Sequence, residues 1–336
     1  DDLRQLREEA AKRPLCRFPI QYDRGFDALL PHIYPLREII RLLHLRSAAL
    51  LELGRNQEAL EDVHLAMRLA DSIKDEPFLV SYLVRGALTK QISSGLFVEG
   101  VVRHAWTDQQ LAVFENYFAS TDLLTEYQSA IRAERAMFIA VLDDMARGKI
   151  PMSVLFNANN PSQTGTGGWW LPTGWLRQNQ KYIAQTHQDY NLAAVNPEER
   201  RAYPQIPTEA EETLDSLQKG LPNPHKIFAL MVLPAITKVT QRAAEIQTTL
   251  DHARIACALE RYYIANQTYP ASLQDLVPQY IQRLPHDLTT GGPVKYQRTS
   301  NGFYKLHSAG WDAKDDGGKP TPTAPKPNET WDWVWQ

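Results

Sequence analysis

Apolar residues recur every three or four positions between Leu36 and Ala70, the spacing that gathers them on one face of a helix. The pattern is interrupted at Gly54 and resumes at Ala59. Because glycine accepts the left-handed conformation that ends helices, we expect two helices joined by a short polar turn. Similar periodicity predicts further helices at 76–93, 96–104, 108–118 and 123–147. The first half of the chain is therefore predicted to be an array of packed helices.

Two regions lack this regular pattern. Residues 1–35 start with a charged helical stretch and then contain four prolines, which predicts an extended lead-in lying on the surface. Residues 148–224 begin with a loop rich in Gly, Asn, Ser and Thr. After it we expect a helix at 175–191, a loop at 196–207, and a short helix capped by Thr208 that ends near Gly220.

The longest apolar stripe runs through 225–265 and predicts one long helix, which Pro234 should kink or divide. The helix should end near Asn266, and Ser272 with Asp275 forms a capping box for a short helix. Residues 294–298 and 302–307 then alternate apolar and polar side chains around Asn301-Gly302, the pattern of a β-hairpin. A helix is thus expected to pack on a small antiparallel sheet.

These elements predict an α+β fold that is mostly α. A helical array is followed by a long helix packed on a small antiparallel sheet. The boundaries divide the chain into a lead-in (1–35), a helical array (36–147), a Trp-rich loop with short helices (148–224) and a C-terminal domain (225–336).

The charge balance restricts the partners. A net charge of -3 over 336 residues gives no basic footprint, so we expect no binding to nucleic acid. No apolar run approaches the roughly 20 residues that span a bilayer. Because the chain starts at Asp1 without Met, we expect that a signal or membrane anchor preceded it.

The chain contains two cysteines, Cys16 and Cys257, which are too few and too distant for a metal site. In an exported protein they could form one disulfide that ties the N-terminus to the long helix. The alternative is a pair of small buried thiols.

Oxygen donors are concentrated after the second predicted strand. Ser308, Asp312, Asp315 and Asp316 lie in a loop with Gly310, Gly317 and Gly318, and Asp332 follows a Pro-rich segment. Hard oxygen ligands in a flexible loop suit calcium, which takes six to eight of them. The alternative is a solvated acidic turn.

The segment from Leu306 to Asp312, L-H-S-A-G-W-D, resembles the end of the globular domain of the major (G-type) pseudopilins of type II secretion systems. Tyr269-Pro270 and Leu284-Pro285-x-Asp287 match the preceding landmarks of that family. The resemblance covers residues 257–336. It departs from the family where Leu288-Thr289-Thr290 replaces Pro-Trp, and where Ala313 replaces a glycine.

The resemblance implies a calcium ion in this loop. By similarity its ligands would be the Leu306 carbonyl, Ser308, Asp312, Asp315 and Asp332. Such a site is filled readily outside the cytosol, where calcium is millimolar, so an extracytoplasmic location, periplasmic or at the cell surface, is expected.

Residues 36–70 resemble one tetratricopeptide (TPR) unit. A helix ends at Leu53-Gly54, a polar turn follows, and the second helix places the small Ala66 where the two helices would touch. Repeats of this kind need about three units to bury a continuous core, and the later helices pair less regularly. The resemblance implies an irregular TPR-like array that binds protein partners.

Tryptophans cluster in two places. Trp169, Trp170 and Trp175 lie in and after the polar loop, either covering the helical layer or forming an exposed surface for a partner, a sugar or a membrane interface. Trp331, Trp333 and Trp335 alternate with Asp332, so in a strand the rings would lie on one face and the carboxylate on the other.

No familiar catalytic motif is present, and the nine histidines have no zinc-type helical spacing. The sequence therefore favours a non-enzymatic, extracytoplasmic scaffold or protein-interaction protein with a structural calcium site. One alternative is a structural subunit of a cell-surface or membrane-associated assembly. Another is a carbohydrate-active hydrolase that uses the loop 169–175 as a substrate platform, with two carboxylates facing across a cleft.

Overall fold

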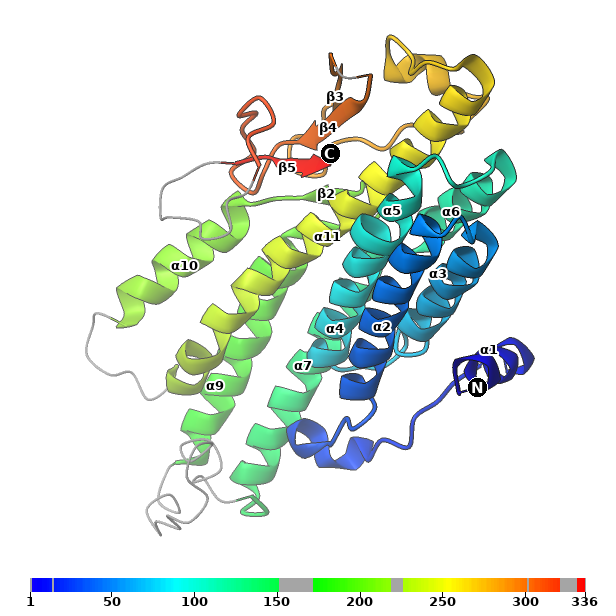
Figure 1. Ribbon diagram of the computed structural model, residues 1–336. Helices are drawn as coiled ribbons and strands as arrows, with labels where there is room; N and C mark the ends of the chain where they lie inside the picture. The colour runs from blue at the N-terminus through cyan, green and yellow to red at the C-terminus, as the bar shows by residue number, and fades with distance from the viewer. Residues whose placement is uncertain are drawn as a thin grey trace.

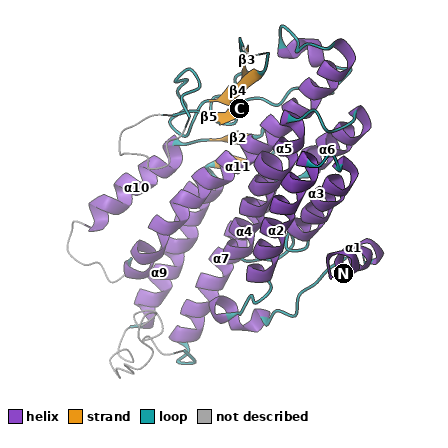
Figure 2. Cartoon of the chain, in the orientation of Figure 1, coloured by secondary structure: helices purple, strands orange, loops and turns teal. Residues whose placement is uncertain are grey.

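The computed structural model describes residues 2–13, 15–150, 172–218, 226–300, 302–320 and 331–335. Within these residues the fold is mostly helical, with a small antiparallel sheet at one end of the helices (Figures 1 and 2). This confirms the predicted fold class in its coarse form.

The N-terminal half consists of helices with short connections. The lead-in contains α1 (Asp2–Lys12) and a 3₁₀ turn (Tyr22–Asp27). The array then follows as α2 (Ile33–Glu52), α3 (Asn56–Asp71), α4 (Leu79–Gln91), α5 (Phe97–Val102), α6 (Asp108–Ser120) and α7 (Leu123–Ala146). A π-helical turn, Ile92–Leu96, joins α4 to α5. The predicted helix pairs are therefore present.

Local sequence signals set several of these boundaries. Gly54 adopts a φ of 71° two residues after the end of α2, as expected for a glycine that ends a helix. Thr107 forms a capping box with Gln110 at the start of α6. Asp122 caps α7 by accepting from the backbone N–H groups of Leu124 and Thr125.

The middle region contains α9 (Thr173–Thr186), which continues as a π-helical turn (His187–Leu192), and α10 (Gln205–Gln218). Two expectations fail here. The segment predicted as a loop contains a two-stranded antiparallel ladder, β1 (Val195–Asn196) with β2 (Arg201–Ala202). Thr208 lies inside α10 and donates its hydroxyl proton to the Pro204 carbonyl, so it does not cap the helix.

The long helix α11 runs from Ile227 to Asn266 as one element, so Pro234 does not divide it. Its C-terminus is closed by Gln267 in the left-handed conformation, one residue after the expected position. The stretch around Ala256 is buried almost all round because α11 packs against α4, α6, α7, α9 and the sheet. It forms the axis of the molecule (Figure 1).

The C-terminal sheet has the order β3 (Lys295–Arg298), β4 (Tyr304–Ser308), β5 (Trp333–Trp335), all antiparallel. The first two strands form the predicted hairpin, with Gly302 at a φ of 85°. Before it, Ser272 and Asp275 form the predicted capping box on a short 3₁₀ helix, Leu273–Leu276. The sheet packs on the C-terminal half of α11.

The two cysteines are free. Cys16 is exposed in the lead-in, whereas Cys257 is buried in α11. The disulfide considered from the sequence does not form, and of the two thiols only Cys257 is in the core. Burial raises the pKa of the Cys257 thiol, so it remains a neutral apolar group.

Among the described residues, no helix combines the length and the apolar character that crossing a bilayer requires.

Candidate metal centre

Strand β4 carries two of the predicted ligands, Leu306 and Ser308, on the face of the sheet that packs on α11. Leu306 is fully buried and pairs with Tyr296 on one side and Trp335 on the other. Ser308, which is 1% exposed, has its hydroxyl oxygen 2.9 Å from Nε2 of His252 on α11. Because side chains alternate along a strand, Leu306 and Ser308 face the helix while His307 faces away from it. The Ser308 hydroxyl is therefore directed at α11 and not at the acidic loop.

The outer face of the sheet carries a cluster of three possible metal ligands. His307, Asp315 and Asp332 each offer one donor atom, and these atoms all lie within 4.8 Å of one another. His307 Nε2 is 3.1 Å from Asp315 Oδ1. His307 comes from β4, Asp315 from the loop after it, and Asp332 from the residue just before β5. The tertiary fold thus joins three segments in one cluster.

Backbone amides hold the carboxylates in place. Asp332 is fully buried and accepts from the N–H of Asp316, at 3.0 Å, and from the N–H of Gly318. Asp315 Oδ1 accepts from the N–H of Gly317 at 3.0 Å. The two glycines have φ values of 70° and 75°, which lets consecutive amides turn inward.

Cationic side chains of the protein also reach this loop. Lys305 donates through Nζ to the carbonyls of Gly317 and Gly318, and Lys295 Nζ lies 3.5 Å from Asp315 Oδ2. The Gly317 amide, followed by His307 and Lys295, lowers the pKa of Asp315 below its ordinary value. The carboxylate is therefore ionised at neutral pH and able to bind a cation.

The remaining predicted ligand, Asp312, lies outside the cluster. It is exposed, and its Oδ1 accepts from the N–H of Lys314 at 3.2 Å. Of the five residues proposed from the sequence, the structure brings together Asp315 and Asp332 and adds His307. The strand alternation that places Ser308 toward the helix was visible in the sequence and would have indicated His307 as the outward residue.

The donor set can be compared with the preferences of metal ions. Calcium takes six to eight oxygens, whereas this cluster contributes two carboxylates and one imidazole nitrogen. Nitrogen together with carboxylate is a donor set that zinc accepts. These three residues suit a divalent ion that accepts a nitrogen ligand. They suit less well an ion such as calcium, for which the sequence predicted a site made of oxygens only.

A second buried carboxylate holds the end of β4, where the loop that carries Asp315 begins. Asp287, which is 3% exposed, accepts through Oδ1 from Thr289 and Thr290 and through Oδ2 from the N–H of Ala309 at 2.6 Å. The segment matched to the pseudopilin landmark is thus bonded to the end of β4. Asp287 is not among the clustered donors, and it holds the end of β4 in place.

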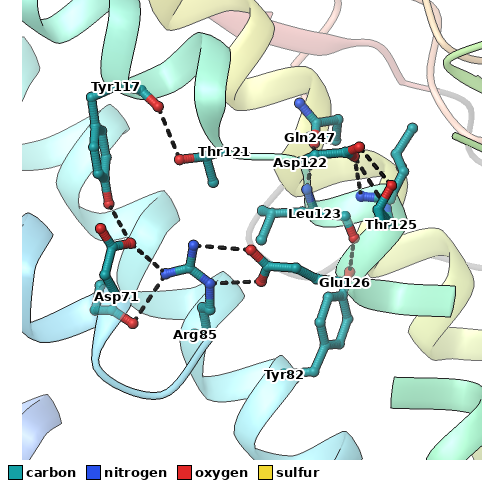
Figure 3. Close-up of polar contacts among 12 residues, drawn as sticks. Asp71, Tyr82, Arg85, Tyr117, Thr121, Asp122, Leu123, Thr125, Glu126 and Gln247 are labelled. Carbon is teal, nitrogen blue, oxygen red and sulfur yellow. Dashed lines mark hydrogen bonds and ion pairs between the residues drawn. The ribbon is translucent and has the colours of Figure 1, made fainter. Parts of the chain in front are cut away.

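The helical body holds a separate buried ion network (Figure 3). Arg85 on α4 is 2% exposed and binds Glu126 of α7 through two nitrogens, at 2.6 and 3.0 Å. Its third nitrogen donates to Asp71 Oδ1 at 2.9 Å and to the Ala70 carbonyl, and Tyr117 of α6 donates to the same Asp71 oxygen. Burial raises the pKa of Glu126, and the bond to Arg85 opposes that rise. This network joins four helices.

The tryptophan surface is only partly described. Trp169 and Trp170 lie outside the described residues, and Trp175 is half-buried on α9. The proposed partner-binding role of these three residues remains a prediction.

Comparisons with protein-family models, with curated proteins and with solved structures gave no match. The function proposed below therefore rests on the positions of His307, Asp315 and Asp332.

Proposed function

We propose that this protein is a non-enzymatic scaffold or protein-interaction protein whose C-terminal domain is closed by a bound divalent cation. The observation that carries the proposal is the convergence of His307, Asp315 and Asp332 within 4.8 Å. A cation there would join β4, the loop after it and the residue before β5. The proposed role is structural, because the cation would tie these three segments together.

The resemblances noted in the sequence extend this proposal to the partners, the ion and the location of the protein. The helix pairs of the array support a TPR-like body that binds protein partners, and the sheet on the long helix supports a pseudopilin-like domain. Calcium is the ion that the pseudopilin resemblance implies, and zinc is the ion that the imidazole favours. We place the protein outside the cytoplasm, as a soluble adaptor or as a subunit of a surface assembly.

The test measures ion binding and stability on metal-free protein. Calcium and zinc are titrated separately by calorimetry, and the melting temperature is recorded with each ion and with chelator. An ion at about 100 times its Kd adds about 2.7 kcal/mol to the free energy of unfolding. Absence of binding by both ions, with no change in melting temperature on chelation, would overturn the proposal.

Two matched variants identify the ligand set. Asp315→Asn removes the charge of a clustered residue but keeps an oxygen for the Gly317 amide, and it should weaken binding at least tenfold. Asp312→Asn makes the same change three residues away, at an exposed carboxylate outside the cluster. It should leave affinity unchanged. Equal weakening by both variants would support the oxygen cage inferred from the sequence, which includes both residues, and the reverse ranking would exclude the His307 cluster.

A further inference from the structure

Helix α2 has an exposed apolar stripe on the side away from the core. We define the α2 stripe as Tyr34, Leu42, Leu45 and the residue that follows the helix, Leu53, which are 71%, 52%, 61% and 70% exposed. At 100° per residue these four positions fall within a sector of about 100°. Ile40, Leu43 and Leu50, which enter the core, project from the opposite side. A surface helix normally carries one apolar face, and α2 carries two.

The flanking charges leave the stripe open. Arg41 donates to Glu38 on its own helix, at 2.8 Å. Arg46 turns toward α3, where it binds Asp62 at 2.7 and 2.8 Å. Both guanidinium groups are thus held by carboxylates of the same chain. In Figure 1, α2 runs along the outside of the array between α3 and α4.

The spacing of the stripe is self-complementary. The pairs Tyr34 with Leu53 and Leu42 with Leu45 are centred on the same point of the helix, between residues 43 and 44. A two-fold axis through that point would align two copies of α2 antiparallel. Each Tyr34 would then lie opposite the partner's Leu53, and each Leu42 opposite the partner's Leu45.

Two charged residues, Glu38 and Glu52, lie in the same sector, and both fit this arrangement. Glu52 is bound to Arg103 and would lie opposite the partner's Pro35. Glu38 would lie opposite the partner's Ala49, whose small side chain leaves room for the carboxylate and its bound Arg41. Arg41 would lie opposite the partner's Arg46, and the carboxylates of the same chain that bind these two guanidinium groups offset their like charges. The contact would extend over about 28 Å of helix, from Tyr34 to Leu53.

We propose that α2 is a homodimer interface in which two copies of the chain pair antiparallel along the α2 stripe. Covering the four side chains on each copy removes their apolar surface from water, which is the main driving force for association. The contact is isologous, so it closes at two copies and does not continue into a filament. This proposal does not rest on the cation site.

Sedimentation or light scattering over a dilution series tests the association. The wild-type chain should show twice the monomer mass, and Leu45→Glu at the centre of the stripe should weaken dimerisation at least a hundredfold. Val113→Glu, on α6 and 49% exposed, is the matched control and should remain dimeric. A wild-type monomer throughout the series would overturn the proposal, as would equal dissociation of both variants. Circular dichroism verifies that each variant is folded.

Cross-linking tests the register. In a Cys16→Ser background, which removes the exposed native thiol, one sample carries Tyr34→Cys and another carries Leu53→Cys. The mixture should form disulfide-linked dimers under mild oxidation, whereas each variant alone should not, because equivalent positions lie about 28 Å apart along the pair. Efficient cross-linking of Tyr34→Cys with itself would exclude the antiparallel arrangement.

Discussion

The Ser308 hydroxyl lies 2.9 Å from Nε2 of His252, and both residues are almost fully buried between β4 and α11. This contact joins the central strand of the small sheet to the long helix. It also decides the direction of a residue that the sequence analysis expected to bind a cation. The sheet therefore has a helix-facing side held by a neutral polar pair and an outer side that carries the charged cluster.

Ser308→Ala should lower the free energy of unfolding without changing cation affinity. The substitution leaves the buried His252 nitrogen without a partner, which costs about 1–3 kcal/mol. Urea unfolding measures the loss, and calorimetry measures the affinity. Ser94→Ala, at an exposed hydroxyl on the π-helical turn Ile92–Leu96, is the control and should change neither. A loss of cation affinity in Ser308→Ala would place the hydroxyl among the ligands.

Gly310→Ala should loosen the C-terminal strand. A Cβ at Gly310 would lie 2.0 Å from the backbone oxygen of Trp331, so one of the two segments must move. Overpacking of this kind costs about 1–3 kcal/mol. Limited proteolysis should show faster cleavage near the C-terminus.

The control for that prediction is Gly174→Ala. No atom lies within 4 Å of a Cβ at this position, which is in the first turn of α9. The control should be neutral or slightly stabilising, because alanine favours helices. Equal behaviour of the two variants would contradict the close approach of Gly310 and Trp331.

Arg85→Met should destabilise the helical array. It leaves Glu126 and Asp71 without their shared cation, and removing one partner of a buried ion pair costs about 3–5 kcal/mol. Since both carboxylates are partly exposed, we expect the lower end of that range. Adding Glu126→Gln should recover part of the loss in chemical denaturation. Arg55→Met, at an exposed pair with Glu58, should show no change.

Acidification should weaken the fold partly through His187. This residue is fully buried, lies near Arg135, and accepts at Nδ1 from the side-chain amide of Asn191 at 3.4 Å. Burial, followed by the charge of Arg135, lowers the pKa of His187 to about 4, against about 6.5 in an unfolded chain. Between these values the unfolded chain binds a proton that the folded chain does not. The free energy of unfolding therefore decreases as the pH falls from about 6.5 to about 4, by about 3 kcal/mol in total.

The variant His187→Gln checks this assignment. Its free energy of unfolding should depend less steeply on pH between 6.5 and 4 than that of the wild type. At pH 7.5 the histidine is neutral in the folded and in the unfolded chain. The difference in free energy of unfolding between wild type and variant at this pH therefore gives the cost of the substitution itself. An unchanged slope would show that other groups cause the acid sensitivity.

Local sequence signals predicted much of the secondary structure. Gly54, the Ser272 cap and the turn before β4 act within a few residues, so the sequence alone predicts their effects. The same reasoning failed at Thr208, where a residue suited to capping lies inside α10. It also failed for the β1–β2 ladder, whose two-residue strands carry no periodic pattern.

The sequence by itself determined the order of the elements, the mostly helical class and the concentration of oxygen donors near the C-terminus. Only the tertiary structure decided which donors meet. Asp315 and Asp332 converge with His307 because β4 and β5 pair in one register, and Asp312, although close in sequence, stays at the surface. Likewise, the partners of Arg85 come from α3 and α7, which local periodicity does not align. Contacts between distant segments depend on packing and register, and neither can be read from the spacing of residues along the chain.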